Sequence, residues 1–335
     1  MGERRAILWG YGSLLGVTAI AVVTAIAAGG RLILSVPPFA VFAITIALFG
    51  LLFRPLQLVA IRHPAPLRQL RDDLTKNREW FIGAAVMLVA LPLLFDATTR
   101  IKQMIPQLQP FYADSFLIDL DNFLFAGHDP WQLTHAVLGE WSTYLIDYVY
   151  AGWLFVQVAM TVFLVLVPRR DIKVRVGLSL QLAWLLMGAG LAVAFASVGP
   201  CFVDDFYGSQ RFAPLMLRLE EYDGLLATNA MNYLLSVQGQ AAVGGGISAM
   251  PSLHVGIAVL ILLSIRTYWP RWQALGWVYV ASIYVGSVHL GWHYATDGMV
   301  SSLGMVLIWK AVNRYCDWIE RRCNVLESQP IAAAQ

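Results

Sequence analysis

The chain has 335 residues, of which 58% are hydrophobic and 13% charged, and its formal net charge is +2. Soluble domains carry about 25% charged residues. The composition therefore excludes an ordinary soluble domain and predicts an all-α, polytopic transmembrane bundle. No basic stripe with interleaved aromatic residues suggests nucleic acid as a partner. The expected partners are the bilayer and a membrane lipid, and the sequence leaves the oligomeric state open.

Apolar runs of membrane-spanning length predict eight spans. Their ranges are 6–29, 37–60, 80–97, 144–168, 176–199, 252–269, 272–291 and 293–313. The second run is interrupted by Arg54 and Pro55, so it is either one span or a span that ends at Phe53 and continues along the membrane surface. The predicted organisation is a two-span extension at 1–62, a basic loop at 63–79, a six-span core within 80–325 and a disordered tail at 326–335.

The positions of the cations predict the topology of these spans. If the amino terminus is cytoplasmic, all but five of the 23 lysines and arginines fall on the cytoplasmic side. The five exceptions are Arg31, Arg100, Lys102, Arg211 and Arg218. Such a bias is the signature of positive-inside insertion. Both termini are therefore expected in the cytoplasm, with the protein in a cell (plasma or inner) membrane.

Two long segments are expected outside the membrane. The first, 98–143, mixes aromatic residues with aspartates, which is typical of an amphipathic helix lying in the membrane interface and broken at Gly127 and Pro130. A plain connector packed on the bundle is an equal alternative. The second, 200–251, leads into a glycine-rich stretch that begins at Gly244. Such a stretch can turn successive backbone N–H groups toward an anion.

Two histidines and an aspartate are expected at this outer surface. His293 and Asp297 are four residues apart, so on a helix the carboxylate can hold one imidazole nitrogen and aim the other. His254 begins the sixth predicted span, also from its outer end. Together with the glycine-rich loop, these residues predict a phosphoryl-transfer site.

Other interpretations of the same residues are weaker. His289, His293 and Asp297 have a spacing that would align three metal ligands on one continuous helix, but Gly291 interrupts it. We therefore expect a structural or neighbouring role for His289, and neither a metal nor a haem bound by the two motif histidines. Asp147 is more simply a hydrogen-bonded interfacial residue than a ligand for a polar headgroup.

The residues also resemble a known family. Pro251-Ser252-Leu253-His254, followed by His293-Tyr294-Ala295-Thr296-Asp297, is similar to the second and third motifs of the type 2 phosphatidic acid phosphatase superfamily. The resemblance covers about 80–313, with motif loops at 200–254 and 287–298. The spelling of the two motifs most resembles the inositol phosphorylceramide synthase-like branch.

The resemblance implies a role for each matching residue. His293 would attack phosphorus and form a phosphohistidine, Asp297 would orient His293, and His254 would protonate the leaving alcohol. Phosphate oxygens would be held by Ser252 and by the backbone around Leu253 and Gly246. This scheme requires no metal and no cofactor.

The sequence departs from the superfamily in its cations. The first motif, a lysine followed seven residues later by Arg-Pro, is not found in the outer segments, and Ser287 stands where the third motif has an arginine. Arg211 is the first candidate to bind phosphate, ahead of Arg218, Arg100 and Lys102. We expect a lipid phosphatase or phosphotransferase whose acceptor is water or a lipid alcohol. Transfer of inositol phosphate to a lipid alcohol is one reaction of this kind. The alternative is a transporter or flippase that binds a phosphate headgroup at the same cluster.

Overall fold

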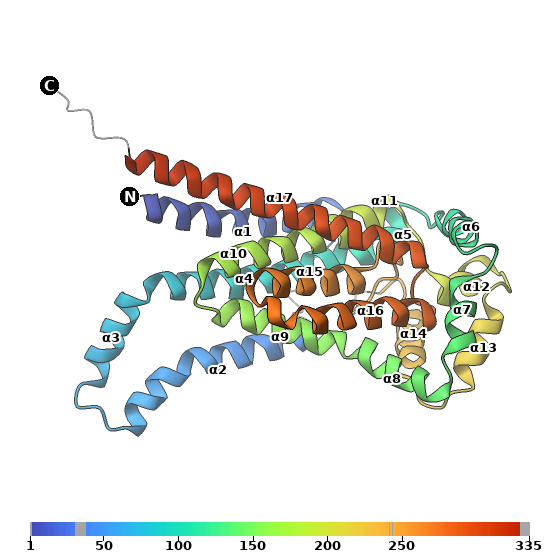
Figure 1. Ribbon diagram of the computed structural model, residues 1–335, viewed down its shortest axis with the longest axis horizontal. Coiled ribbons are helices and arrows are strands. Elements are labelled where there is room, and N and C mark those ends of the chain that lie inside the picture. The colour runs from blue at the N-terminus through green and yellow to red at the C-terminus, as the bar shows by residue number, and fades with distance from the viewer. Residues whose placement is uncertain (1, 31–37, 241, 243, 329–335) are drawn as a thin grey trace.

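The computed structural model describes residues 2–30, 38–240, 242 and 244–328, and within these residues every regular element is a helix. The long helices run side by side along the long axis of the molecule (Figure 1). They are α1 (Gly2–Ala27), α2 (Pro38–Ala60), α4 (Arg78–Gln103), α8 (Glu140–Ala151) with α9 (Trp153–Leu166), α10 (Arg170–Leu182) with η1 (Ala183–Leu191) and α11 (Ala192–Ala194), α15 (Leu253–Tyr268), α16 (Gln273–His289) and α17 (Ala295–Ser328).

Shorter helices connect the long ones. Most of them lie at the end of the bundle opposite the two termini (Figure 1). They are α3 (Pro66–Lys76), α5 (Ile105–Leu108), α6 (Asp114–Leu124), α7 (Pro130–Val137), α12 (Pro200–Tyr207), α13 (Ala213–Glu220), α14 (Leu226–Ser236) and η2 (Pro270–Trp272). The segments predicted as outer connectors are thus folded into helices that cover one end of the bundle.

Each of the eight predicted spans falls on one of the long helical stretches. Among the described residues, four helices are long and apolar enough to cross a membrane: Arg5–Ala27, Arg78–Gln103, Glu140–Leu166 and Arg170–Ala194, while α15 is a shorter apolar helix. The chain is therefore an all-helical membrane protein, and the count of eight spans stays a prediction. The interruption at Arg54 and Pro55 does not end the helix, because α2 continues through Pro55 to Ala60.

Three predicted segments differ in detail from the structure. The basic loop 63–79 contains the amphipathic helix α3. The outer segment 98–143 holds α5, α6 and α7, and the chain breaks between α6 and α7 at Gly127, whose φ of 87° favours glycine. Residues 326–328 of the predicted tail belong to α17, and 329–335 lie outside the described residues.

The core of the bundle is continuous along its length. Buried apolar side chains from α1, α4, α10, α15 and α17 form one cluster. Within it η1 is a π-helical segment of nine residues, an element that often marks functional sites in membrane and soluble helices. Gly188 of η1 lies directly against Leu253, since a Cβ there would be 2.6 Å from the Leu253 Cδ1 atom.

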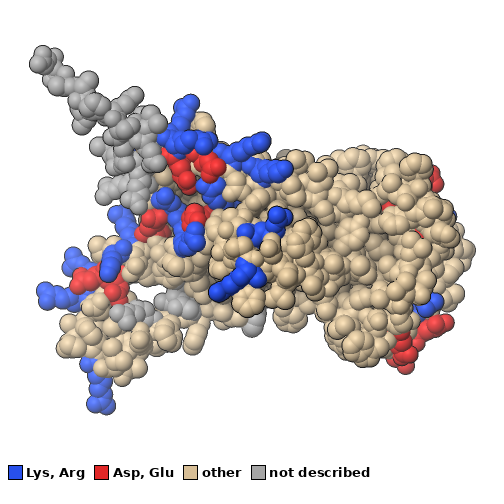
Figure 2. Space-filling view, viewed as in Figure 1, with Lys and Arg blue, Asp and Glu red and all other residues tan. Residues whose placement is uncertain are grey.

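Charge is distributed unevenly over the molecule. Figure 2 shows lysine and arginine gathered at the end that carries the chain termini, whereas the opposite end is mostly uncharged on the visible face. At the terminal end, Arg175 of α10 bonds Asp317 of α17 at 2.7 Å. The three cysteines, Cys201, Cys316 and Cys323, are buried free thiols.

Candidate active site

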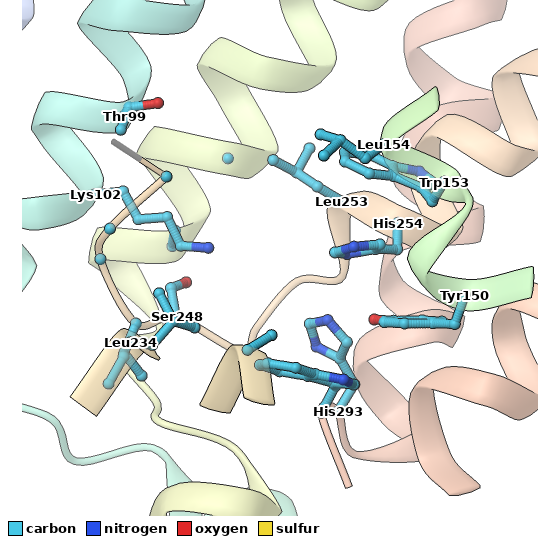
Figure 3. A pocket seen from close by; sticks show the side chains of 18 of the residues that line it. Thr99, Lys102, Tyr150, Trp153, Leu154, Leu234, Ser248, Leu253, His254 and His293 are labelled. Atoms are coloured by element: carbon cyan, nitrogen blue, oxygen red, sulfur yellow. The ribbon is translucent and has the colours of Figure 1, made fainter. Parts of the chain in front are cut away.

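A cavity of about 390 Å³ lies among the ends of α4, α8, α9, α14 and α15 (Figure 3). Its lining includes Gly246, Leu253, His254 and His293, all of which were predicted for the site. Residues 39 apart in the sequence therefore meet at one hollow, as the motif pair predicts. The rest of the wall is largely apolar, with aromatic side chains on one side.

His293 is held by Asp297. The His293 Nδ1 atom is 3.2 Å from the Asp297 Oδ2 atom, and the same oxygen accepts a hydrogen bond from the Tyr294 backbone N–H at 3.1 Å. Asp297 is fully buried and His293 is 7% exposed. A carboxylate at Nδ1 favours the tautomer with its proton on that nitrogen, so Nε2 is the nitrogen that carries a free electron pair.

Gly291 makes the turn that separates α16 from α17. Its φ is 75°, and a Cβ there would be 3.0 Å from the Leu215 side chain. His289 therefore ends one helix while Asp297 lies in the first turn of the next. The turn predicted at Gly291 is confirmed, and the continuous row of three metal ligands does not form.

His289 belongs to a neighbouring polar cluster. Its two ring nitrogens lie 3.0 Å and 2.9 Å from the hydroxyls of Thr134 and Thr143. Its ring stacks on that of His135, with centroids 3.9 Å apart. Burial lowers the pKa of His135, which keeps that ring neutral. The structural interpretation of His289 agrees with these contacts.

His254 is held by aromatic rings. Tyr150 stacks on it with centroids 4.6 Å apart and an interplanar angle of 14°, and Trp153 lies 4.2 Å away at 37°. The centroids of His254 and His293 are 6.2 Å apart with an interplanar angle of 58°, so the two rings are immediate neighbours. Both histidines face the same cavity (Figure 3).

Ser252 begins the helix that carries His254. It is fully buried and precedes α15, where its hydroxyl accepts a weak hydrogen bond, 3.4 Å long, from the Val255 backbone N–H. It is thus the N-cap of the helix that carries His254. Its neighbours Pro251 and Leu253 line the cavity, but Ser252 does not.

The structure does not bring Arg211 to the cavity. Its guanidinium forms an ion pair of 2.8 Å with Asp129, and its side chain is 40% exposed. Arg218 donates to the His135 carbonyl. Neither arginine is among the residues that line the cavity.

Lys102, the last of the predicted cations, does line the cavity, and its ammonium group points into it (Figure 3). A sequence signal for this residue exists. Lys102 is followed seven residues later by Gln109-Pro110, a spacing that resembles the lysine and Arg-Pro of the first motif, with glutamine in place of arginine.

The glycine-rich loop lies directly on the end of α4 beside Lys102. At Gly246, where φ is 98°, a Cβ would be 3.0 Å from the Lys102 carbonyl carbon and the Gln103 nitrogen. The Gln103 side chain also donates to the Ala242 carbonyl. Gly244, Gly245 and Gly246 line the cavity, and Gly246 lies against the backbone and the Cγ atom of Lys102.

Two aspartates of α6 position the motif turn, a role that the sequence did not reveal. Asp121 accepts hydrogen bonds of 2.7 Å and 3.0 Å from the backbone N–H groups of Ala295 and Thr296, at the start of α17. Burial raises the pKa of Asp121, and these two bonds oppose the rise because they favour the carboxylate.

Asp114, seven residues earlier, lies on the same face of α6. It accepts from the Tyr294 hydroxyl at 2.9 Å, from the Tyr207 hydroxyl at 2.9 Å and from the backbone N–H groups of Val198 and Gly199. Asp147 of α8 does the same for α14, since its carboxylate accepts from the N–H groups of Leu226 and Ala227. The hydrogen-bonded interpretation of Asp147 agrees with this contact, although Asp147 also lines the cavity.

An oriented imidazole, a second imidazole and one ammonium group thus line one cavity of the bundle. The family description "PAP2 superfamily" matches residues 115–311, which is more than half of the chain. The chain therefore belongs to the PAP2 superfamily and is a membrane enzyme of the phosphatase type. No curated protein and no solved structure matches the chain in the corresponding comparisons.

Proposed function

We propose that the protein cleaves a lipid-linked phosphate ester through a phosphohistidine on His293. The observation that carries this proposal is the His293–Asp297 contact of 3.2 Å, which leaves Nε2 as the nucleophilic nitrogen in a cavity that His254 and Lys102 also line. Nucleophilic catalysis by histidine needs a neutral ring that is oriented by a partner on the other nitrogen. The adjoining apolar wall suits the lipid part of such a substrate.

In the first step the Nε2–P bond forms while the P–O bond to the leaving group breaks, and the leaving oxygen takes a proton from His254. The leaving group is the lipid alcohol of a phosphate ester, or the lipid monophosphate of a diphosphate. In the second step an acceptor oxygen attacks phosphorus, the P–N bond breaks, and the acceptor's proton passes to His254. Water as the acceptor gives hydrolysis, and a lipid alcohol gives transfer. Inositol-phosphate transfer is the particular reaction that the motif spelling favours.

Charge on the transferring group is balanced by Lys102 in this proposal. The phosphoryl oxygens need cations or several N–H donors. Lys102 supplies a cation from one side of the cavity, and the backbone of the loop from Gly244 to Gly246 lies beside it. In this proposal Lys102 is the phosphate-binding cation, the role that was predicted for Arg211 from the sequence.

Capture of the intermediate tests the function. Purified protein is mixed with ³²P-labelled phosphatidic acid, prenyl diphosphate or phosphatidylinositol plus ceramide and then quenched in alkali, which preserves phosphohistidine. We expect label on the protein with at least one substrate, and its loss in His293→Ala. His128→Ala, at an exposed histidine of the same end, is the matched control. Turnover at the wild-type rate by His293→Ala would refute the mechanism.

We also propose that the cavity faces the extracytoplasmic side of the cell membrane. The charge asymmetry in Figure 2 supports this orientation through the positive-inside rule. Cysteine introduced at exposed Asp119, at the site end, is expected to react with an impermeant maleimide in intact cells. Cysteine introduced at exposed Arg321, near the carboxyl end of α17, is expected to react only after lysis. The reverse pattern would overturn the orientation.

A further inference from the structure

Tyr150 has a buried hydroxyl with no partner in the described residues. The side chain is 6% exposed and its Oη atom makes no hydrogen bond there. Buried tyrosine hydroxyls usually find one. Tyr150 lines the cavity, so a molecule bound in the cavity can supply the hydrogen-bond partner of its hydroxyl.

The direction of this hydroxyl is specific. The Tyr150 ring lies flat on His254, and its hydroxyl end points toward the space between His254 and His293 (Figure 3). Lys102 approaches the same space from the opposite side of the cavity in this view. A group bonded to His293 Nε2 would therefore have an ammonium on one side and a phenol on the other.

The ring of Tyr150 is firmly placed. Gly286 of α16 faces it, because a Cβ at Gly286 would be 3.1 Å from the Tyr150 Cδ2 atom. One turn earlier on α8, Asp147 is fixed by the N–H groups of α14. The hydroxyl thus lies on a rigid element, which is where a preorganised donor is most effective.

We propose that Tyr150 is a further catalytic residue whose O–H donates a hydrogen bond to a phosphoryl oxygen in the transition state and in the phosphohistidine. The proposal rests on the proposed function. Tyr150 keeps its proton throughout both steps, so His254 alone gives and regains the transferred proton. The donor supplies part of the stabilisation that an arginine would give at the position of Ser287, which here bonds the Tyr284 carbonyl.

The test separates the hydroxyl from the ring. Tyr150→Phe keeps the stack on His254 and removes only the donor. Inorganic orthovanadate, which adopts the geometry of a transferring phosphoryl group, is titrated into the detergent-solubilised full chain by calorimetry, and kcat and KM are measured on the ³²P-lipid that turns over. Tyr148→Phe is the matched control, because Tyr148 lies on the same helix and is 64% exposed.

We expect Tyr150→Phe to weaken orthovanadate binding about tenfold and to lower kcat about tenfold with KM little changed, the loss typical of one hydrogen bond to a charged oxygen. Tyr148→Phe should match the wild type. If Tyr150→Phe binds orthovanadate and turns over lipid like the wild type, the inference fails while the proposed function stands. If the wild-type chain neither binds orthovanadate nor forms a labelled His293, the proposed function fails and takes the inference with it.

Discussion

The two histidines of the cavity are held by different kinds of contact. His293 is fixed through one nitrogen by the buried carboxylate of Asp297, whereas His254 is fixed through its faces by Tyr150 and Trp153. A carboxylate selects one tautomer and stabilises a positive charge on the ring. Aromatic faces fix the plane of a ring and leave its nitrogens to gain and lose a proton. The difference suits a nucleophile and a proton carrier, respectively.

Asp297→Asn is the most direct test of the carboxylate that holds His293, because it preserves the size of the side chain but removes its negative charge. We expect kcat to fall by about 10³, because a neutral amide does not select the nucleophilic tautomer or stabilise the cationic ring. Rapid-quench measurement of the phosphoenzyme should show slower formation. The thermal midpoint in detergent serves as the control for folding. A kcat within tenfold of the wild type would show that the charge of Asp297 is not required.

His254→Ala tests the other ring. A general acid contributes about 10²–10⁴ in rate when the leaving group is a poor one. We therefore expect a loss of at least about 10² with an alkyl phosphate ester and a much smaller loss with 4-nitrophenyl phosphate, whose leaving group needs no proton. Equal losses on both esters would contradict the role of proton donor.

Asp121→Asn tests the support beneath His293. The change replaces one acceptor oxygen by an N–H₂ group that faces a backbone N–H, so a buried hydrogen bond is lost. We expect the free energy of unfolding to fall by about 1–2 kcal/mol and kcat to fall about tenfold. The measurements are the thermal midpoint and the rate. Asp119→Asn, at an exposed position of the same helix, should change neither.

Trp153→Phe makes the smallest change, because a smaller ring still covers one face of His254. We expect kcat to fall about threefold, with no change in the tautomer or charge of His293. Trp141→Phe, at a 77% exposed position of α8, is the control. A loss as large as that of His254→Ala would mean that Trp153 does more than orient the ring.

The sequence was informative where chemistry depends on local spacing. His293 and Asp297 are four residues apart, and Gly291 marks the turn before them, so their proximity was predictable from local spacing. The two residues do not share a helix, because His293 lies in the turn before α17 and Asp297 lies in the first turn of α17. The eight apolar ranges likewise coincide with the long helices. Both signals are local in the sequence.

The rest depends on contacts between distant helices. Nothing near Tyr150 or Trp153 in the sequence indicates that they stack on His254, about a hundred residues away. The sequence identifies Arg211 as an outer cation but does not say which anion it binds. Tertiary packing pairs its guanidinium with Asp129. The aspartates of α6 resembled polar positions of a surface helix, and only the fold shows that Asp114 and Asp121 hold the motif turn.

Helix α17 has a consequence for the mechanics of the molecule. Its 34 residues extend about 50 Å at 1.5 Å per residue, whereas the hydrocarbon core of a bilayer is about 30 Å thick. One continuous rod thus begins at the nucleophilic turn and ends among the charges near Arg175, where Asp317 anchors it to α10. A tilt of α17 imposed at its charged end would displace Asp297 at the opposite end. A partner or lipid that binds the last turns of α17 would therefore change the geometry of the active site.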